Sequence, residues 1–214
     1  MPIIIDPSGY TSWAQMISEA VAYVTGCPSF MVEDKVKSAA REFLERSNVW
    51  RSRKVEFLTT VAAQASYGFD LPANARLNNI HVAYRDGVEV DVQLVGEEDD
   101  TDTDATADTW KLGVEPSGYS IRVTPTPSVA GAVVTGTVSY VTSLDASGIP
   151  DWIYDRWHED IAAGAAGKLL LQITRPWANP QMAGPLLSKF EEGILEASNF
   201  GGPVKRRSLR VQAR

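Results

Sequence analysis

The spacing of apolar residues changes twice along this chain, and that change limits the folds it can adopt. Near both ends, apolar side chains recur every three or four residues, the period of a helix with one buried face. Over about residues 51–142, apolar and polar residues alternate, the period of a strand with one buried face. Helices and strands that are segregated along a chain indicate an α+β fold. We therefore predict a helical core built from both termini, with an inserted antiparallel β sheet or sandwich.

Four segments carry the helical spacing. The first begins at Thr11 or Ser12, and Ser12 with Gln15 has the pattern of a capping box, in which each side chain bonds the other residue's backbone N–H. Gly26 and Pro28 end this helix, because glycine tolerates a left-handed cap and proline blocks continuation. The other predicted helices span residues 29–47, 150–173 and 181–198.

The middle of the chain carries strand signals. Asp86-Gly87 stands between two alternating segments, 80–84 and 88–94, and is typical of a two-residue hairpin turn. Further strands are predicted over residues 54–61, 109–114, 119–124 and 132–141. The chain thus divides into an N-terminal helical part of the core (1–50), a β insertion (51–142), the C-terminal helices of the core (143–200) and a basic tail (201–214).

Charge is distributed unevenly between the body and the tail. The formal net charge is −7, yet residues 201–214 carry five basic side chains and no acidic one. Subtracting the tail's +5 from −7 leaves −12 for residues 1–200. An acidic body disfavours uniform coating of nucleic acid, and a basic tail on such a body indicates that the tail has a partner of its own.

Composition excludes several classes of protein. With 44% hydrophobic and 22% charged residues, this chain of 214 residues has the balance of a globular protein that buries a sizeable core. No apolar run reaches the roughly 18 residues that a transmembrane helix needs, and we expect no membrane span and no signal peptide. One cysteine, Cys27, excludes an internal disulfide and fits a reducing compartment.

The motifs that would indicate an enzyme are incomplete. His158-Glu159 begins a zinc-protease motif, but Ala162 stands where the second histidine is required. Gly167-Lys168 ends like a phosphate-binding loop, but Leu169 replaces the required serine or threonine, and the pair lies inside a predicted helix. We therefore predict that the chain is not an enzyme and carries no cofactor.

The acidic segment 97–108 is the remaining candidate for a metal site. Asp100, Asp102 and Asp104 have the first spacings of a calcium-binding loop. Such a loop has glycine at its sixth position and glutamate at its twelfth, whereas this chain has Ala105 and Lys111. We therefore predict a solvated loop between strands and no metal site.

Several short sequence blocks occur in a recognisable order. They are Gly26-Cys27-Pro28, AAREFLERS (39–47), Val49-Trp50-Arg51, YGFDLP (67–72), GIPDWIY (148–154), AAGA (162–165), Lys168-Leu169-Leu170, PWANP (176–180) and FEEGI (190–194). In order and spacing these blocks resemble the head-to-tail adaptor (connector) proteins of tailed bacteriophages. The resemblance covers most of the chain outside residues 85–145 and the two ends.

The resemblance implies a structural protein of the virion. Such adaptors form a homo-oligomeric ring, commonly of twelve subunits, beneath the portal protein, in the neck between head and tail. The ring extends the DNA channel and is the attachment platform for tail or nozzle proteins. Its location would be the host cytoplasm during assembly. Packaged DNA would pass through without specific binding, and an acidic lining favours that passage because it repels phosphates.

The resemblance also suggests roles for particular residues. The helical part would contact the portal and neighbouring subunits, with packing between subunits by Trp152, Trp157, Gly164, Gly167 and Trp177. The C-terminal segment would reach into the portal, which makes the tail the predicted docking element. Its predicted docking residues are Lys205, Arg206, Arg207, Leu209, Arg210 and Val211.

Two other functions remain open from the sequence. One is a tail-associated binding module in which the β insertion recognises a carbohydrate or another tail component through Tyr84, Trp110 and Tyr119. The other is a metal-dependent enzyme with its metal in the segment 97–108.

Overall fold

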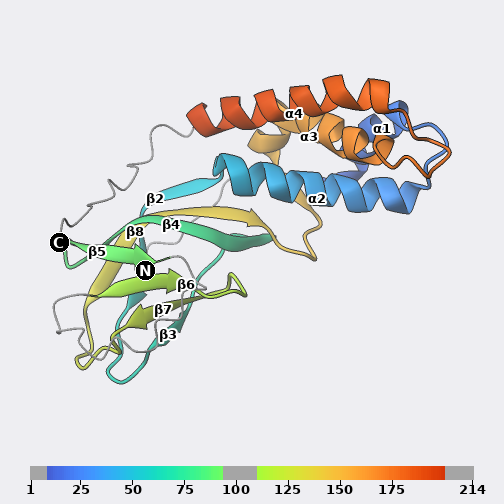
Figure 1. Ribbon diagram of the computed structural model, residues 1–214. Coiled ribbons are helices and arrows are strands. Elements are labelled where there is room, and N and C mark those ends of the chain that lie inside the picture. The colour runs from blue at the N-terminus through green and yellow to red at the C-terminus, as the bar shows by residue number, and fades with distance from the viewer. Residues whose placement is uncertain (1–8, 94–109, 201–214) are drawn as a thin grey trace, which may run out of the picture.

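Segregated helices and strands are what the structure contains, and the predicted α+β class is confirmed. The computed structural model describes residues 9–93 and 110–200 (Figure 1). Its helices are α1 (Trp13–Tyr23), α2 (Ser29–Ser47), α3 (Asp151–Leu170) and α4 (Pro180–Phe200). Its strands are β1 (Tyr10–Ser12), β2 (Arg51–Thr59), β3 (Ser66–Gly68), β4 (Ala75–Arg85), β5 (Val88–Gln93), β6 (Lys111–Val114), β7 (Ser120–Thr124), β8 (Val133–Thr142) and β9 (Gly148–Pro150).

Seven strands form one curled sheet in the order β2-β8-β4-β5-β6-β7-β3. In Figure 1, β6, β7 and β3 lie below β8 and β4. All the neighbouring strands are antiparallel except β5 and β6, which are parallel. The prediction of a purely antiparallel sheet is therefore wrong at this one pair. A parallel pair needs a crossover of a dozen or more residues, and residues 94–110 supply that length.

The turn between β4 and β5 is the hairpin that Asp86-Gly87 predicted. Asp86 and Gly87 both have positive φ angles, 48° and 86°, as a type I′ turn requires. The Asp86 carboxylate also accepts a hydrogen bond of 3.0 Å from the backbone N–H of Val133, and the Asp86 N–H donates to the Val133 carbonyl at the same distance. These two bonds fix the register of the hairpin against β8.

A second, two-stranded sheet of β1 and β9 joins the starts of α1 and α3. Ser12 pairs with Gly148, and a Cβ atom on Gly148 would lie 2.2 Å from the Thr11 carbonyl oxygen, so only glycine fits there. Helix α1 begins directly after Ser12, but the Ser12 side chain makes no capping bond. The predicted capping box is therefore wrong, because Ser12 is the last residue of a paired strand.

Glycines set the spacing between α3 and α4. A Cβ atom on Gly164 would lie 2.3 Å from the Phe190 ring, and one on Gly167 would lie 2.8 Å from Leu187. The Phe43 ring on α2 meets Phe190 and Trp157, with ring centroids 6.1 Å and 6.0 Å apart. The Phe190 ring therefore fills the space beside Gly164 and packs on aromatic rings of two other helices, and Leu187 fills the space beside Gly167.

Asn48 connects the end of α2 to the sheet. It adopts a left-handed conformation at the end of α2, with φ 49°, and its Oδ1 accepts hydrogen bonds from Asn78 (3.0 Å) and Ser139 (2.8 Å). Two residues further on, the Trp50 carbonyl accepts a bond of 2.8 Å from the Tyr140 N–H. The helical part and the sheet are thus joined by hydrogen bonds as well as by apolar contact.

Candidate functional site

Large apolar side chains are exposed at the end of the helical part that lies furthest from the sheet. The α1–α2 and α3–α4 loops lie together at this end (Figure 1). Phe30 and Ile173 are 70% and 80% exposed, and Leu171 and Met182 are about half exposed. We call Phe30, Leu171, Ile173 and Met182 the distal apolar surface. Side chains of this size gathered in one place are typical of a contact with another protein.

A hydrogen bond shapes the α3–α4 loop, and a charge on that loop acts on the α1–α2 loop. The Asn179 N–H donates to the Leu170 carbonyl at 3.0 Å, which turns the chain from α3 into α4. In the other loop, burial raises the pKa of the Cys27 thiol, and the positive charge of Arg175 partly opposes that rise. Cys27 and Arg175 are therefore electrostatic neighbours across the two loops.

The residues predicted to pack between subunits fall into two groups. Trp157, Gly164 and Gly167 are buried within the single chain, between α3 and its neighbouring helices. Trp152 and Trp177 are only partly buried, and both pack at the margin of the core. Contact between subunits through these five residues stays a prediction, and only Trp152 and Trp177 have surface available for it.

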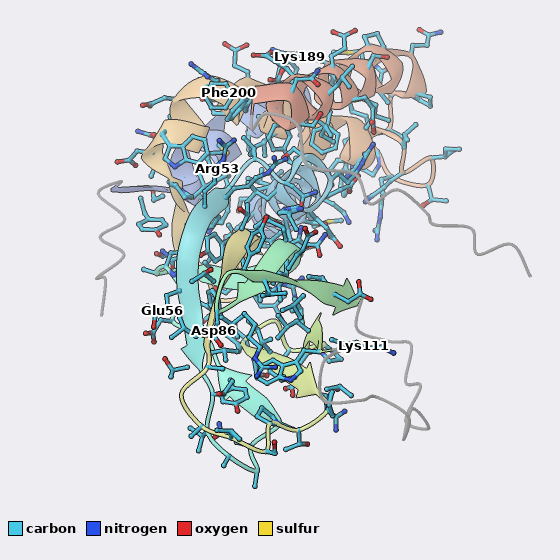
Figure 2. The ribbon with its side chains drawn as sticks, turned by 90° about the vertical axis from the view of Figure 1, so that its left-hand side faces the viewer. Arg53, Glu56, Asp86, Lys111, Lys189 and Phe200 are labelled. Atoms are coloured by element: carbon cyan, nitrogen blue, oxygen red, sulfur yellow. The ribbon has the colours of Figure 1, made fainter. Side chains whose placement is uncertain are left out.

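The last helix ends at the side of the helical part nearer the sheet, opposite the distal apolar surface (Figure 1). Phe200, its final residue, is 56% exposed and packs its ring 5.5 Å from Trp157, with the Arg156 guanidinium 4.2 Å above the Phe200 ring. Figure 2 shows Phe200 and Lys189 on the helical part, and Glu56, Asp86 and Lys111 on the sheet.

The predicted docking residues, 205–211, lie outside the described residues.

The two histidines do not assemble a metal site. His158 Nδ1 lies 2.9 Å from a Glu19 carboxylate oxygen, and its ring stacks on Tyr154 at 4.6 Å. Glu159 pairs with Lys189 at 2.7 Å instead of facing a metal. Over residues 9–93 and 110–200, no three side chains of the metal-binding types come together. The acidic segment 97–108 lies outside the described residues.

Lys168 and the aromatic residues of the sheet have other partners. Lys168 pairs with Glu42 of α2 and lies near the end of α3, which disfavours a phosphate-binding loop there. Trp110 is buried, and the Arg85 guanidinium lies 4.0 Å from its ring centroid. Of the three aromatic residues considered for a binding module, Tyr119 is the most exposed, at 49%.

His81 makes the stability of the fold depend on pH. Burial, together with the nearby charge of Arg51, lowers the pKa of His81 to about 4, and its Nε2 is buried with no hydrogen-bond partner within the described part of the chain. An unfolded histidine has a pKa near 6.5. Between these values the unfolded chain binds a proton that the folded chain does not, so acidification destabilises the fold.

We expect the wild-type protein to lose about 1 kcal/mol more stability than His81→Gln between pH 7 and pH 5, after allowance for solvent screening of a partly exposed ring. Urea unfolding at both pH values measures this difference. Equal losses in the wild type and His81→Gln would refute the assignment.

Comparison with known proteins leaves these surfaces as the main guide to function. No model of a known protein family matches the chain, and no curated protein matches it either. None of the described helices is both long enough and apolar enough to span a membrane.

Proposed function

We propose that this chain is a head-to-tail adaptor of a tailed bacteriophage, forming a ring between the portal and the tail. The observation that carries the proposal is the distal apolar surface, because four large apolar side chains at the tip of a helical part favour a protein contact over a catalytic site. The order of the sequence blocks in the helical parts supports the same function.

The proposed ring explains the arrangement of charge and helices. Each subunit contacts the next through two different surfaces, and such a heterologous contact closes only by rotation. In the proposal, helices from both ends of the chain act as one core that carries these contacts, and the distal apolar surface meets the neighbouring subunit. Residues 1–200, with a formal charge of −12, line a channel through which DNA passes without specific binding.

We expect the protein to be monomeric or weakly associated alone and to form rings only on the portal. Acidic bodies repel one another, so a partner must offset that repulsion and bring the subunits together. Light scattering of the free protein, and negative-stain images of the protein with and without the portal, test this expectation. A stable closed ring formed without the portal would contradict it.

Substitutions in the distal apolar surface test which surface carries the ring contact. Phe30→Asp and Ile173→Asp should abolish ring formation on the portal and leave the free protein folded. Aspartate at position 30 lies in the first turn of α2, where the helix dipole favours a negative charge. Val88→Asp is the matched control, because Val88 is also 70% exposed but lies at the β4–β5 hairpin. Rings that persist in both variants would exclude this surface from the contact.

A further inference from the structure

Two arginines from distant parts of the chain meet where α2 crosses the sheet. The Arg41 Nε on α2 donates to the Thr142 carbonyl at 3.4 Å. Thr142 pairs with Ala75 across β8 and β4, and Arg76 follows directly on β4, paired with Val141. The positive charge of Arg76 lowers the pKa of Arg41, after burial as the larger cause. The fold therefore holds two like charges close together.

Arg76 has one buried polar atom without a hydrogen-bond partner in the described part of the chain. Its Nε is buried without a hydrogen-bond partner, and the described residues offer Arg76 no ion pair. The aliphatic part of the Arg76 side chain lies against the β6–β7 turn, because a Cβ atom on Gly118 would lie 3.3 Å from the Arg76 Cβ and 3.4 Å from its Cδ. Leaving a buried donor of a charged group unpaired is unfavourable, so a guanidinium with a buried, unpaired Nε and no ion pair in the described residues favours an anionic partner.

The nearby acidic residues do not fill this role. Glu115, in the same β6–β7 turn, accepts hydrogen bonds from Ser66 and Ser120. Glu45 and Asp34 on α2 act on Arg41 through their charge, yet neither lies within ion-pair distance of it in the described structure. The negative charges of Glu45 and Asp34 would repel a run of phosphates more strongly than a single carboxylate.

We propose that Arg41 and Arg76 form a receptor for a single carboxylate side chain supplied by a protein partner. Two guanidinium groups match the two oxygens of a carboxylate, and the hydrogen bonds are strengthened by charge on both sides. The receptor stands independently of the adaptor proposal, although a ring of acidic subunits would supply such carboxylates.

Acetate is the probe for this receptor, with chloride replaced by acetate at constant ionic strength. The Arg76 Nε–Hε signal in NMR spectra of the labelled protein, assigned by its loss in Arg76→Lys, should shift and reach saturation. Arg41→Gln should weaken acetate binding by about tenfold, because one charge-assisted partner is lost. Arg122→Gln is the matched control, since it removes the same charge from an exposed position on β7 and should leave the titration unchanged.

Three outcomes would overturn the proposal. The first is a shift that does not saturate or that all arginine signals share, and the second is a titration that Arg41→Gln does not change. The third is a stronger response to duplex DNA than to acetate at equal anion concentration, which would assign the site to nucleic acid. If Arg41→Gln does not fold, Arg41→Lys retains the charge but not the planar fork and should still weaken binding.

Discussion

Deleting residues 203–214 is expected to abolish binding to the portal and to leave the fold intact. The tail carries five basic residues on an otherwise acidic chain, and apolar residues stand among them. The buried core that the structure describes runs from Trp13 to Ala197, so the melting temperature should change little. Filled heads assembled with the truncated protein should fail to retain DNA. A portal pull-down and a thermal melt, each comparing truncated and full-length protein, measure these effects.

The basic residues of the tail also suit binding to DNA, and its apolar residues distinguish portal binding from DNA binding. A phosphate backbone requires only the charges, whereas a protein groove also requires Leu209 and Val211. Replacing Leu209 and Val211 with serine keeps every charge and should still weaken portal binding. Replacing Arg206 and Arg207 with glutamine should also weaken it, because arginine pairs bidentately with carboxylates. Intact portal binding by the truncated protein, together with loss of a DNA mobility shift, would assign the tail to nucleic acid.

Two parts of the fold were predicted correctly because residues close together in the sequence determine them. Helix α2 has the predicted bounds, 29–47, because Pro28 precedes its apolar stripe and Asn48 ends it in a left-handed conformation. The Asp86-Gly87 turn was predictable for a similar reason, since few dipeptides adopt two successive positive φ angles. In both cases the residues that decide the structure are neighbours in sequence.

Features that depend on distant partners could not be predicted in this way. Strands β1 and β9 have three residues each, which is too short for an alternating pattern, and they pair across most of the chain. The parallel pairing of β5 and β6 likewise depends on the crossover and not on either strand.

The residues of the candidate surfaces were also hard to predict from the sequence, because their positions depend on how distant elements pack. Apolar spacing predicts Met182 on the same face of α4 as Phe190, but Met182 is 46% exposed whereas Phe190 and Ala183 are buried. Eight residues of helix rotate Met182 roughly 80° away from Phe190, which places it at the edge of the buried face. No pattern in the sequence predicts that Arg41 and Arg76 lie close together, because their proximity arises where α2 crosses the sheet. One signal in the sequence does point to the distal apolar surface, because Phe30 lies at the start of a helix but outside the apolar stripe of that helix.

Replacing Gly164 should destabilise the protein, although glycine is a poor helix former. Alanine in the middle of a helix is favoured over glycine by about 1 kcal/mol, so propensity alone predicts a more stable protein. Packing predicts the opposite, because a Cβ atom at position 164 would lie 2.3 Å from the buried ring of Phe190. Overpacking of a core contact costs about 1–3 kcal/mol. We expect Gly164→Ala to lose stability in urea unfolding and Gly164→Leu to lose more.

A double-mutant cycle separates this contact from a general effect on the helix. Phe190→Leu alone should be destabilising because it leaves a cavity in the core. Combined with Gly164→Ala it should be less damaging than the sum of the two single changes, since the smaller side chain makes room for the new methyl group. Additive losses would show that the two positions are not in contact. A gain of about 1 kcal/mol in Gly164→Ala would mean that propensity outweighs packing and that α3 and α4 are not closely packed at this point.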